Sequence, residues 1–514
     1  MADTLLISPS GSTVLDGLTS LPVDALDAFT YGAANAYVIH ELIDIPRFAA
    51  ALAKALVLFP LYGARVKSAE GGGMPWMITL PPAGLPLTIA SNPSTDQLIM
   101  ASHAVVQNPL PFIPPLTPAR QMVFNPDAPL AAVLITHFPN LSASCVAVRR
   151  WHPIGSDFVA SRFIRAVSKF YLDAALSARD LDEPTPVYES LRHFLPPNPD
   201  RALLQGIDTS AVETYFNPDT TPHPQLVLPA PNVRLDFRLS GAQVAAIRTA
   251  IRALGPGGPD TPLVSAQDCL VALVAVALNA ADPGTSRIHT IDTILDVRGQ
   301  AGVPAELSWN GTTFAPTDRI ALGPAGAGAL PVDDSASSDT ELYTYASAIR
   351  RSLARAREPA FLAALIDLQA QRAAEAIARG GPGGGEIIDL ASKPGHLCVN
   401  STLRLDAAMR PHTHFGHPGE LRSYVSTVPF VRHLKLARPN EPPPPSNPFL
   451  ADTATPRDPL EAEEARMAAV EATLFFPDSA SGYWFGGVGP RERFVREMEA
   501  RVRAVGGGTV QWVR

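Results

Sequence analysis

Cys145-Val-Ala-Val-Arg-Arg-Trp-His-Pro-Ile-Gly-Ser-Asp-Phe158 begins as an apolar strand and ends where a helix is expected to start. Pro153 and Gly155 turn the chain immediately after His152. Apolar residues then recur at helical spacing, namely Phe158, Phe163, Ile164, Val167 and Phe170. A histidine between a strand and a helix is held rigidly and can still face a cleft. His152 is therefore the main catalytic candidate, and the alternative is a loop histidine satisfied by a backbone carbonyl.

The segment before this stretch predicts its partner strand. Ala131-Ala-Val-Leu-Ile-Thr-His-Phe138 is rich in β-branched and apolar residues, and Pro139-Asn-Leu-Ser142 has the composition of a turn. We therefore expect a hairpin that leads directly to His152.

The length of the chain predicts more than one domain. A single hydrophobic core rarely serves 514 residues. Residues 183–231 are rich in proline and are typical of an extended crossover. We expect an N-terminal domain at 1–205 that carries His152, a Pro-rich crossover at 206–232 and a C-terminal domain at 233–514.

Several local patterns predict the elements of both halves. Ser240 and Gln243 have capping-box spacing, Ser265 and Asp268 form a second capping pair, and residues 269–281 are nearly all apolar, as in a buried helix. Further helices are expected at 47–59, 341–357, 359–379 and 491–505, and further strands at 76–80, 233–239, 288–297, 396–405, 423–435, 473–477 and 483–488.

Composition excludes several classes of function. A net charge of −8 and the lack of a basic stripe argue against nucleic acid as a partner. No apolar run approaches the roughly 18 residues of a membrane span. The first residues lack a secretory pattern, which favours a cytoplasmic protein. Three cysteines in apolar surroundings, Cys145, Cys269 and Cys398, favour buried free thiols.

Metal and serine-hydrolase chemistry find little support in the sequence. His412, His414 and His417 have a spacing compatible with zinc, but no cysteine or carboxylate lies between them to complete a ligand set. The chain has no Gly-x-Ser-x-Gly nucleophile motif. We expect no metal site.

The order of motifs resembles the BAHD family of acyl-CoA-dependent acyltransferases, and most of all its fungal, trichothecene 3-O-acetyltransferase-like branch. The motifs that carry the resemblance are Pro60-Leu-Tyr-Gly-Ala-Arg65 after a helix, the hairpin before His152, the capped helix after Leu239, the buried helix at 266–281, Asp296-Val-Arg298, Asn310-Gly311 and Phe415-Gly416. The resemblance implies an α/β fold of two similar chloramphenicol-acetyltransferase-like domains. Each has a mixed sheet flanked by helices, and a channel lies at their interface.

The motif around His152 departs from the family pattern. The family has His-x-x-x-Asp-Gly, whereas this chain has Ser156 and Asp157 at the last two positions. In the family the aspartate supports the catalytic loop through an arginine that corresponds to Arg298. We expect Asp157 to pair with Arg298, with Gly155 supplying the backbone freedom. The competing expectation is that Asp157 caps the following helix.

The resemblance also implies a mechanism. His152 acts as general base in a direct ternary-complex transfer from acyl-CoA, the co-substrate, to a hydroxyl or amine, and no permanently bound cofactor is needed. Asn400 or Ser401, in the stretch that matches the family's oxyanion region, is expected to contact the substrate oxygen. Arg149 and Arg150 are expected either to steer a phosphate of coenzyme A or to lie in solvent.

Two other readings remain open. A repurposed family member would use His152 for cyclisation or release of a polyketide bound to a carrier protein. A silent member would bind its ligand without turnover. We expect a monomer in each case, without nucleic acid or membrane partners.

Overall fold

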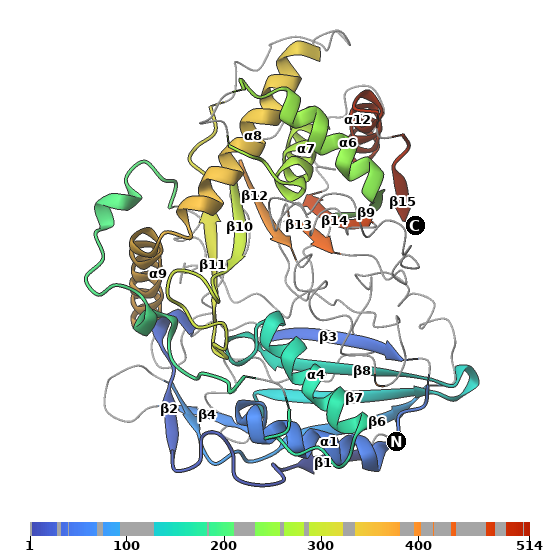
Figure 1. Ribbon diagram of the computed structural model, residues 1–514, viewed down its shortest axis with the longest axis vertical. Coiled ribbons are helices and arrows are strands. Elements are labelled where there is room, and N and C mark those ends of the chain that lie inside the picture. Colours follow the sequence, from blue (N-terminus) through green and yellow to red (C-terminus); the bar gives the residue numbers. More distant parts are fainter. Residues whose placement is uncertain are drawn as a thin grey trace.

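The computed structural model describes most of the chain, with gaps. The described residues are 3–27, 32–39, 41–68, 76–92, 128–181, 184–209, 232–257, 262–281, 287–321, 335–380, 395–401, 415, 433–437, 469–477, 490–506 and 508–513. Figure 1 shows two α/β halves, one built around a five-stranded sheet and the other around a seven-stranded sheet.

The first half is built on a mixed sheet with the order β1-β6-β7-β8-β3. Its strands are β1 (Asp3–Ile7), β6 (Leu85–Ser91), β7 (Ala131–Phe138), β8 (Ala143–Trp151) and β3 (Gly32–Ile39). Only β6 and β7 run parallel to each other. The predicted β7–β8 hairpin is confirmed, with a turn at Pro139–Leu141 and a left-handed Ser142.

Two helices of the first half pack against each other beside this sheet (Figure 1). They are α1 (Ile45–Leu58) and α4 (Asp157–Leu172). Asp44 caps α1 by accepting from the Arg47 amide at 2.9 Å, and Pro60 follows its end as predicted. A small antiparallel sheet, β2 (Ser20–Pro22), β5 (Trp76–Thr79) and β4 (Arg65–Ser68), lies beside them.

The second half is built on a seven-stranded mixed sheet. Its order is β11 (Thr312–Pro316), β10 (Thr290–Asp296), β12 (His396–Ser401), β13 (His433–Ala437), β14 (Ala469–Pro477), β9 (Asn232–Ser240) and β15 (Gln511–Val513). The central strands β10, β12 and β13 are parallel. Both edges of β14 are occupied by β13 and β9, and its predicted partner at 483–488 lies outside the described residues.

Helix α7 (Ala266–Ala281) is the core of the second half. It is apolar on all sides and contacts α6 (Gly241–Ala253), α8 (Ser335–Arg355) and α12 (Pro490–Ala504). The two predicted capping pairs are present. The Ser240 and Gln243 side chains cap α6 reciprocally, and the Asp268 carboxylate accepts from the Ser265 amide at 2.7 Å. The three cysteines all lie among the described residues, where they are buried and form no disulfide, as expected.

Helix α9 (Pro359–Gly380) joins the two halves. It contacts three 3₁₀ turns that precede the crossover, Ala25–Asp27, Leu191–Phe194 and Arg201–Leu204. The Arg201 guanidinium pairs with Asp367 of α9 at 2.6 Å. Most of the predicted crossover, 210–231, lies outside the described residues.

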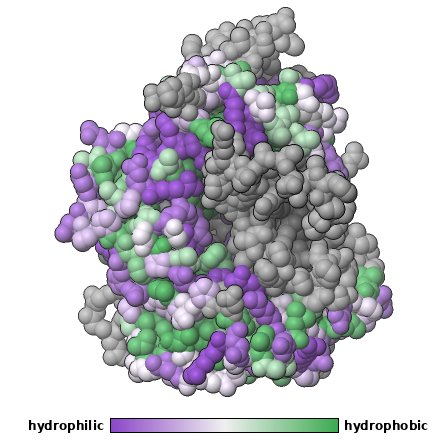
Figure 2. Space-filling model, viewed as in Figure 1, coloured by the Kyte–Doolittle hydropathy of each residue, from purple (hydrophilic) through white to green (hydrophobic). Residues whose placement is uncertain are grey.

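The surface shown in Figure 2 intersperses hydrophilic and hydrophobic residues over both halves. Within the described ranges, no helix combines the length and apolar character needed to cross a bilayer.

Candidate active site

His152 lies at the predicted strand-to-helix corner. It follows β8 directly and opens a 3₁₀ turn, His152–Ile154, whose carbonyl at His152 accepts from the Gly155 amide at 3.0 Å. Strand β8 is paired on both sides, by β7 and β3, so the end of the strand is fixed. The residue is partly exposed, whereas its Nδ1 atom is buried. The histidine is thus rigidly positioned without being fully enclosed.

The Arg150 side chain holds this corner together. Its guanidinium is fully buried and donates to the Gly155 carbonyl, to Oδ1 of Asn35 on β3 and, at 2.8 Å, to Oδ1 of Asp157. One buried cation therefore connects β3, the turn after His152 and the first residue of α4. The expectation that Arg150 steers a phosphate or lies in solvent was wrong, because the side chain is fully buried and each of its three guanidinium nitrogens donates to a group inside the fold.

A glycine is needed at position 155 because there is no room for a side chain, and not because of its backbone dihedral angles. Its φ of −166° is ordinary extended backbone, so the expected use of glycine's conformational freedom is wrong. A Cβ at this position would lie 2.5 Å from Oη of Tyr62 and 2.8 Å from Cδ of Arg150. The Tyr62 ring is itself fixed by stacking on Phe163, with centroids 4.2 Å apart. The turn after His152 therefore fits only a residue without a side chain.

The expected pair between Asp157 and Arg298 does not form. Asp157 pairs with Arg150 instead, and Arg298 pairs with Asp296 at 2.9 Å. In both cases the arginine pairs with a carboxylate that is close to it in the sequence. Arg150 and Asp157 both belong to the first half, and Arg298 and Asp296 both belong to the second half. Asp157 does occupy the first turn of α4, where a carboxylate favours the helix dipole, but Ser156 is the N-cap and its side chain makes no capping bond.

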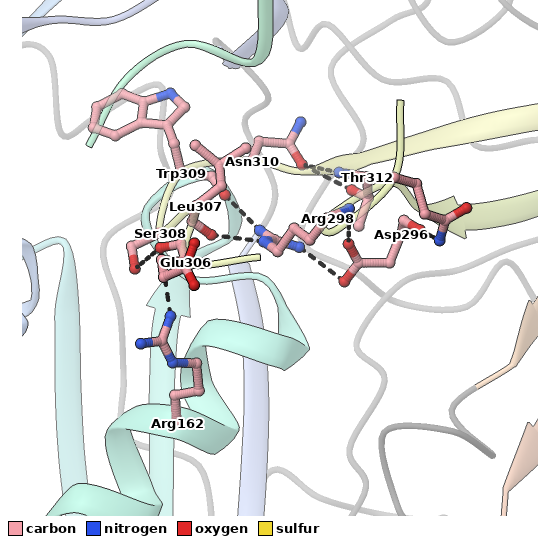
Figure 3. Close-up of polar contacts among 10 residues, drawn as sticks. Arg162, Asp296, Arg298, Glu306, Leu307, Ser308, Trp309, Asn310 and Thr312 are labelled. Carbon is pink, nitrogen blue, oxygen red and sulfur yellow. Dashed lines mark hydrogen bonds and ion pairs between the residues drawn. The ribbon is translucent and has the colours of Figure 1, made fainter. Parts of the chain in front are cut away.

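Arg298 is instead held by the loop that follows it (Figure 3). Its guanidinium donates to the carbonyls of Leu307, at 2.6 Å, and Trp309. A Cβ at Gly311 would lie 2.6 Å from Cζ of Arg298, so this glycine lets the arginine pack on the backbone. Asn310, fully buried, accepts from the amide and hydroxyl of Thr312. The Asp296-Val-Arg and Asn310-Gly311 motifs therefore form a single structural unit.

This unit contacts the His152 loop through an aromatic ring. Cζ of Arg298 lies 5.2 Å from the centroid of the Phe158 ring, in cation–π geometry. Arg162, one turn further along α4, donates to the Glu306 carbonyl at 3.4 Å (Figure 3) and to the Pro184 carbonyl at 2.7 Å. Arg298 thus contacts the segment that follows His152 from across the interface, but through the Phe158 ring and not through the expected carboxylate.

A buried carboxyl lies behind this contact. Asp27, fully buried, accepts a hydrogen bond from Nε1 of Trp309 in the second half. Burial raises the pKa of Asp27 well above its ordinary value, and the Asp24 carboxylate adds to the shift. The hydrogen bond from Trp309 and the charge of Arg298 oppose it. A neutral acid and an indole therefore form part of the interface between the halves.

The environment of His152 favours a neutral imidazole. Burial lowers the pKa of His152 to about 3. The Asp157 carboxylate opposes this shift, and the Arg150 and Arg298 guanidinium groups add to it. The ring is therefore unprotonated at neutral pH, which is the form that a general base requires.

The remaining predicted residues lie in the second half. Asn400 and Ser401 are the last residues of β12, are partly exposed and pair with β13. Since β12 is parallel to β10, they lie at the same sheet edge as Asp296, and β12 points toward the first half in Figure 1. The structure therefore brings them to the interface side of the sheet.

Phe415, from the Phe-Gly motif, serves as an anchor between the halves. Phe415 is buried, its ring packs against Phe48 of α1 and Tyr171 of α4, and its amide donates to Oγ of Ser168 at 3.0 Å. The neighbouring histidines, His412, His414 and His417, lie outside the described residues.

Sequence reasoning missed one cluster of potential metal ligands. Asp208, His289 and His396 bring three ligand atoms within 4.8 Å of one another, at the sheet edge opposite to Asp296 and Arg298. The three residues come from distant segments, so no spacing in the sequence indicates them.

No protein-family model matches the chain, and no curated protein matches it by sequence. Solved structures do resemble it. TRI101 of F. graminearum, complexed with coenzyme A and deoxynivalenol, has a TM-score of 0.59 at 12% identity, over 97% of this chain and 100% of that one. Vinorine synthase has a TM-score of 0.56 at 15% identity, over 93% and 95%. The condensation domain of the monacolin K polyketide synthase MokA has a TM-score of 0.51 at 11% identity, over 96% and 98%. The chain therefore has the two-domain α/β fold of BAHD-type acyltransferases and condensation domains, which confirms the predicted fold class.

Proposed function

We propose that the protein transfers an acyl group, acetyl in the simplest case, from acyl-CoA to a hydroxyl or amine of a small molecule, with His152 as general base. The observation that carries the proposal is the position of His152. It lies at a braced strand-to-helix corner, beside the contact between the two halves, in a fold shared with a protein that was crystallised with coenzyme A and a small-molecule acceptor.

In this mechanism the neutral imidazole takes the proton of the acceptor hydroxyl or amine as its oxygen or nitrogen attacks the thioester carbonyl. The tetrahedral intermediate then collapses, the carbon–sulfur bond breaks, and the imidazolium returns the proton to the departing thiolate. The products are the acylated acceptor and free coenzyme A, so the histidine ends as it began. Asn400 or Ser401 would donate to the oxyanion, a contribution of roughly 2.7–4 kcal/mol for one well-placed group.

The bracing network supplies what this chemistry needs. Hydrogen bonds from Arg150 hold both ends of the turn that follows His152, and Arg298 packs on Phe158 from the other half. A base held in one orientation loses little entropy when the reacting atoms meet. This chain has Ser156 and Asp157 where the family motif has aspartate and glycine. The loop is nevertheless supported, by Arg150 in place of Arg298.

Thiol release from acetyl-CoA, followed with a thiol reagent in the presence of a panel of terpenoid and polyketide alcohols and amines, tests the proposal. His152→Gln should lower the rate by about 10² to 10⁴ while leaving the circular dichroism spectrum unchanged. His193→Gln is the matched control, because the His193 side chain is exposed and pairs with Glu189. Acylation by His152→Gln at the native rate would rule out the proposed role.

A second candidate function is favoured by the likeness to a polyketide synthase condensation domain. In that case His152 would act on an acyl chain carried by a phosphopantetheine arm, in a cyclisation or release step. Offering the same acyl group on coenzyme A and on a loaded carrier protein separates the two, since each candidate predicts a preference for a different donor. Binding of coenzyme A without turnover of either donor would favour the silent binding protein instead.

A further inference from the structure

Asp208, His289 and His396 meet at the edge of the large sheet that faces away from the His152 corner. His396 is the first residue of β12, His289 immediately precedes β10, and Asp208 follows the Arg201–Leu204 turn. Strand β10 separates them from Arg298 by roughly 20 Å, given about 3.3 Å per residue. The proposed acyl transfer makes no use of this cluster.

The second nitrogen of each imidazole already has a partner. Nδ1 of His396 lies 2.9 Å from Oδ2 of Asp292, which is nearly fully buried. Nδ1 of His289 lies 2.9 Å from Oγ1 of Thr290. Metal-bound histidines characteristically have such an oxygen partner, which fixes the tautomer and the orientation of the ring. Both Nε2 atoms are therefore the ligand positions.

The spacing of the cluster fits a metal better than a hydrogen bond. Nε2 of His396 lies 3.4 Å from Oδ2 of Asp208, beyond the usual 2.7–3.2 Å range for a nitrogen donor to an oxygen. Two ligands of a tetrahedral zinc ion, each about 2.0–2.1 Å from the metal, are separated by roughly 3.4 Å. Gly395 makes room for the His289 ring in this cluster, because a Cβ at position 395 would overlap Nε2 of His289.

The charges around the cluster are also appropriate. Asp208 and Asp292 together balance a divalent cation. Metal binds the neutral imidazole, so these two carboxylates supply the charge that compensates the ion.

We propose that Asp208, His289 and His396 form a site for a divalent first-row transition metal, with zinc as the ion that suits two imidazoles and one carboxylate. Magnesium and calcium prefer oxygen ligands only, and do not fit this set. Because Asp208 lies in the first residues of the crossover (206–232) and both histidines belong to the second half, the metal would fasten the start of the crossover to the amino-terminal edge of the large sheet.

The test uses the full-length protein, stripped with a chelator and titrated with Zn²⁺ by calorimetry. We expect one tight equivalent per chain and a rise in melting temperature on addition of Zn²⁺. Asp208→Asn and His289→Gln replace partly exposed ligands and should each weaken binding by more than about tenfold. Asp292→Asn, which removes only the orienting carboxylate, should weaken it by about 10- to 100-fold.

Two controls separate this site from other histidines. His193→Gln alters an exposed histidine that pairs with Glu189 and should leave the affinity unchanged. Joint replacement of His412, His414 and His417 by alanine should also leave it unchanged. Absence of the tight equivalent in the native chain, or its survival in both Asp208→Asn and His289→Gln, would overturn the proposal.

Discussion

Arg150 and Asp157 form a 2.8 Å ion pair across the turn that contains His152. The arginine side chain is fully buried, and the carboxylate is 23% exposed. The pair joins the last residues of β8 to the first turn of α4, so it fixes both ends of the turn that contains His152. This is the contact that replaces the expected bridge to Arg298.

Breaking the pair should destabilise the protein. Asp157→Asn leaves the buried Arg150 cation without its carboxylate, and we expect a loss of about 1–3 kcal/mol in the free energy of unfolding. A double-mutant cycle with Arg150→Met, measured by urea unfolding, should give a coupling energy of about 0.5–3 kcal/mol. The matched cycle between Asp157 and Arg298→Met should give a smaller value. The opposite ranking would show that Arg298, and not Arg150, supports the loop.

Gly155→Ala should impair both stability and activity. The new methyl group meets Oη of Tyr62 and Cδ of Arg150, and overpacking of this kind typically costs about 1–3 kcal/mol. Because the Arg150 contact also positions the turn, the rate of acyl transfer should fall more than the loss of folded protein explains. Thermal unfolding and steady-state kinetics measure the two effects.

Adding Tyr62→Phe should restore part of the loss in Gly155→Ala, since it removes the nearest clashing atom. Tyr62→Phe alone should be nearly neutral, because within the described part of the chain the buried Tyr62 hydroxyl has no hydrogen-bond partner. Gly11→Ala is the glycine control, because a Cβ there meets no atom within 4 Å. Equal effects of the Gly11 and Gly155 substitutions would contradict the steric account.

The sequence predicted the His152 corner well because its signals are local. The hairpin of β7 and β8 and the apolar face of α4 follow from residue spacing alone, and the structure confirms them. The partner of Asp157 was not predictable in this way. Nearly every residue of β8 is buried, so no polar alternation marked Arg150 as an interior cation.

Arg298 and the metal cluster show a second limit. The Arg298 guanidinium is held mainly by the backbone carbonyls of Leu307 and Trp309, which any residue type supplies, so no side-chain pattern records the contact. His289 and His396 meet because β10 and β12 are neighbours in the sheet, and Asp208 joins them from a distant segment after the Arg201–Leu204 turn. Strand order over such separations is set by packing of the whole half.

Asp27→Asn should stabilise the protein at neutral pH. The folded-state pKa of Asp27 is raised, so ionisation in the unfolded chain opposes folding at every pH above about 4. An amide keeps an oxygen that accepts from Trp309 and has no charge to bury. Its advantage in unfolding free energy should vanish as the pH falls below the ordinary pKa of aspartate. An unchanged advantage at pH 3, or a loss at pH 7, would contradict a neutral Asp27.

The pH dependence of catalysis should reflect the lowered pKa of His152. With an unperturbed histidine as base, kcat/KM would fall below about pH 6.5. Burial lowers the pKa of His152 to about 3, so kcat/KM should stay nearly constant from pH 8 down to about pH 5. A clear acid limb near pH 6.5 in the native enzyme would show that the ring is far more solvated than the structure indicates.

The same pKa predicts a stability signature that needs no substrate. Between about pH 6.5 and pH 3 the unfolded chain binds a proton at this histidine that the folded protein does not, so stability must fall as the pH falls. The slope from this one group is at most about 1.4 kcal/mol per pH unit, and it approaches zero about one pH unit above 6.5, where both states are neutral. His152→Gln should remove that part of the slope, whereas the exposed control His193→Gln should leave it unchanged. Urea unfolding of the three proteins at pH 7.5, 6 and 5 measures the difference, and parallel curves for His152→Gln and the native chain would place the ring in solvent.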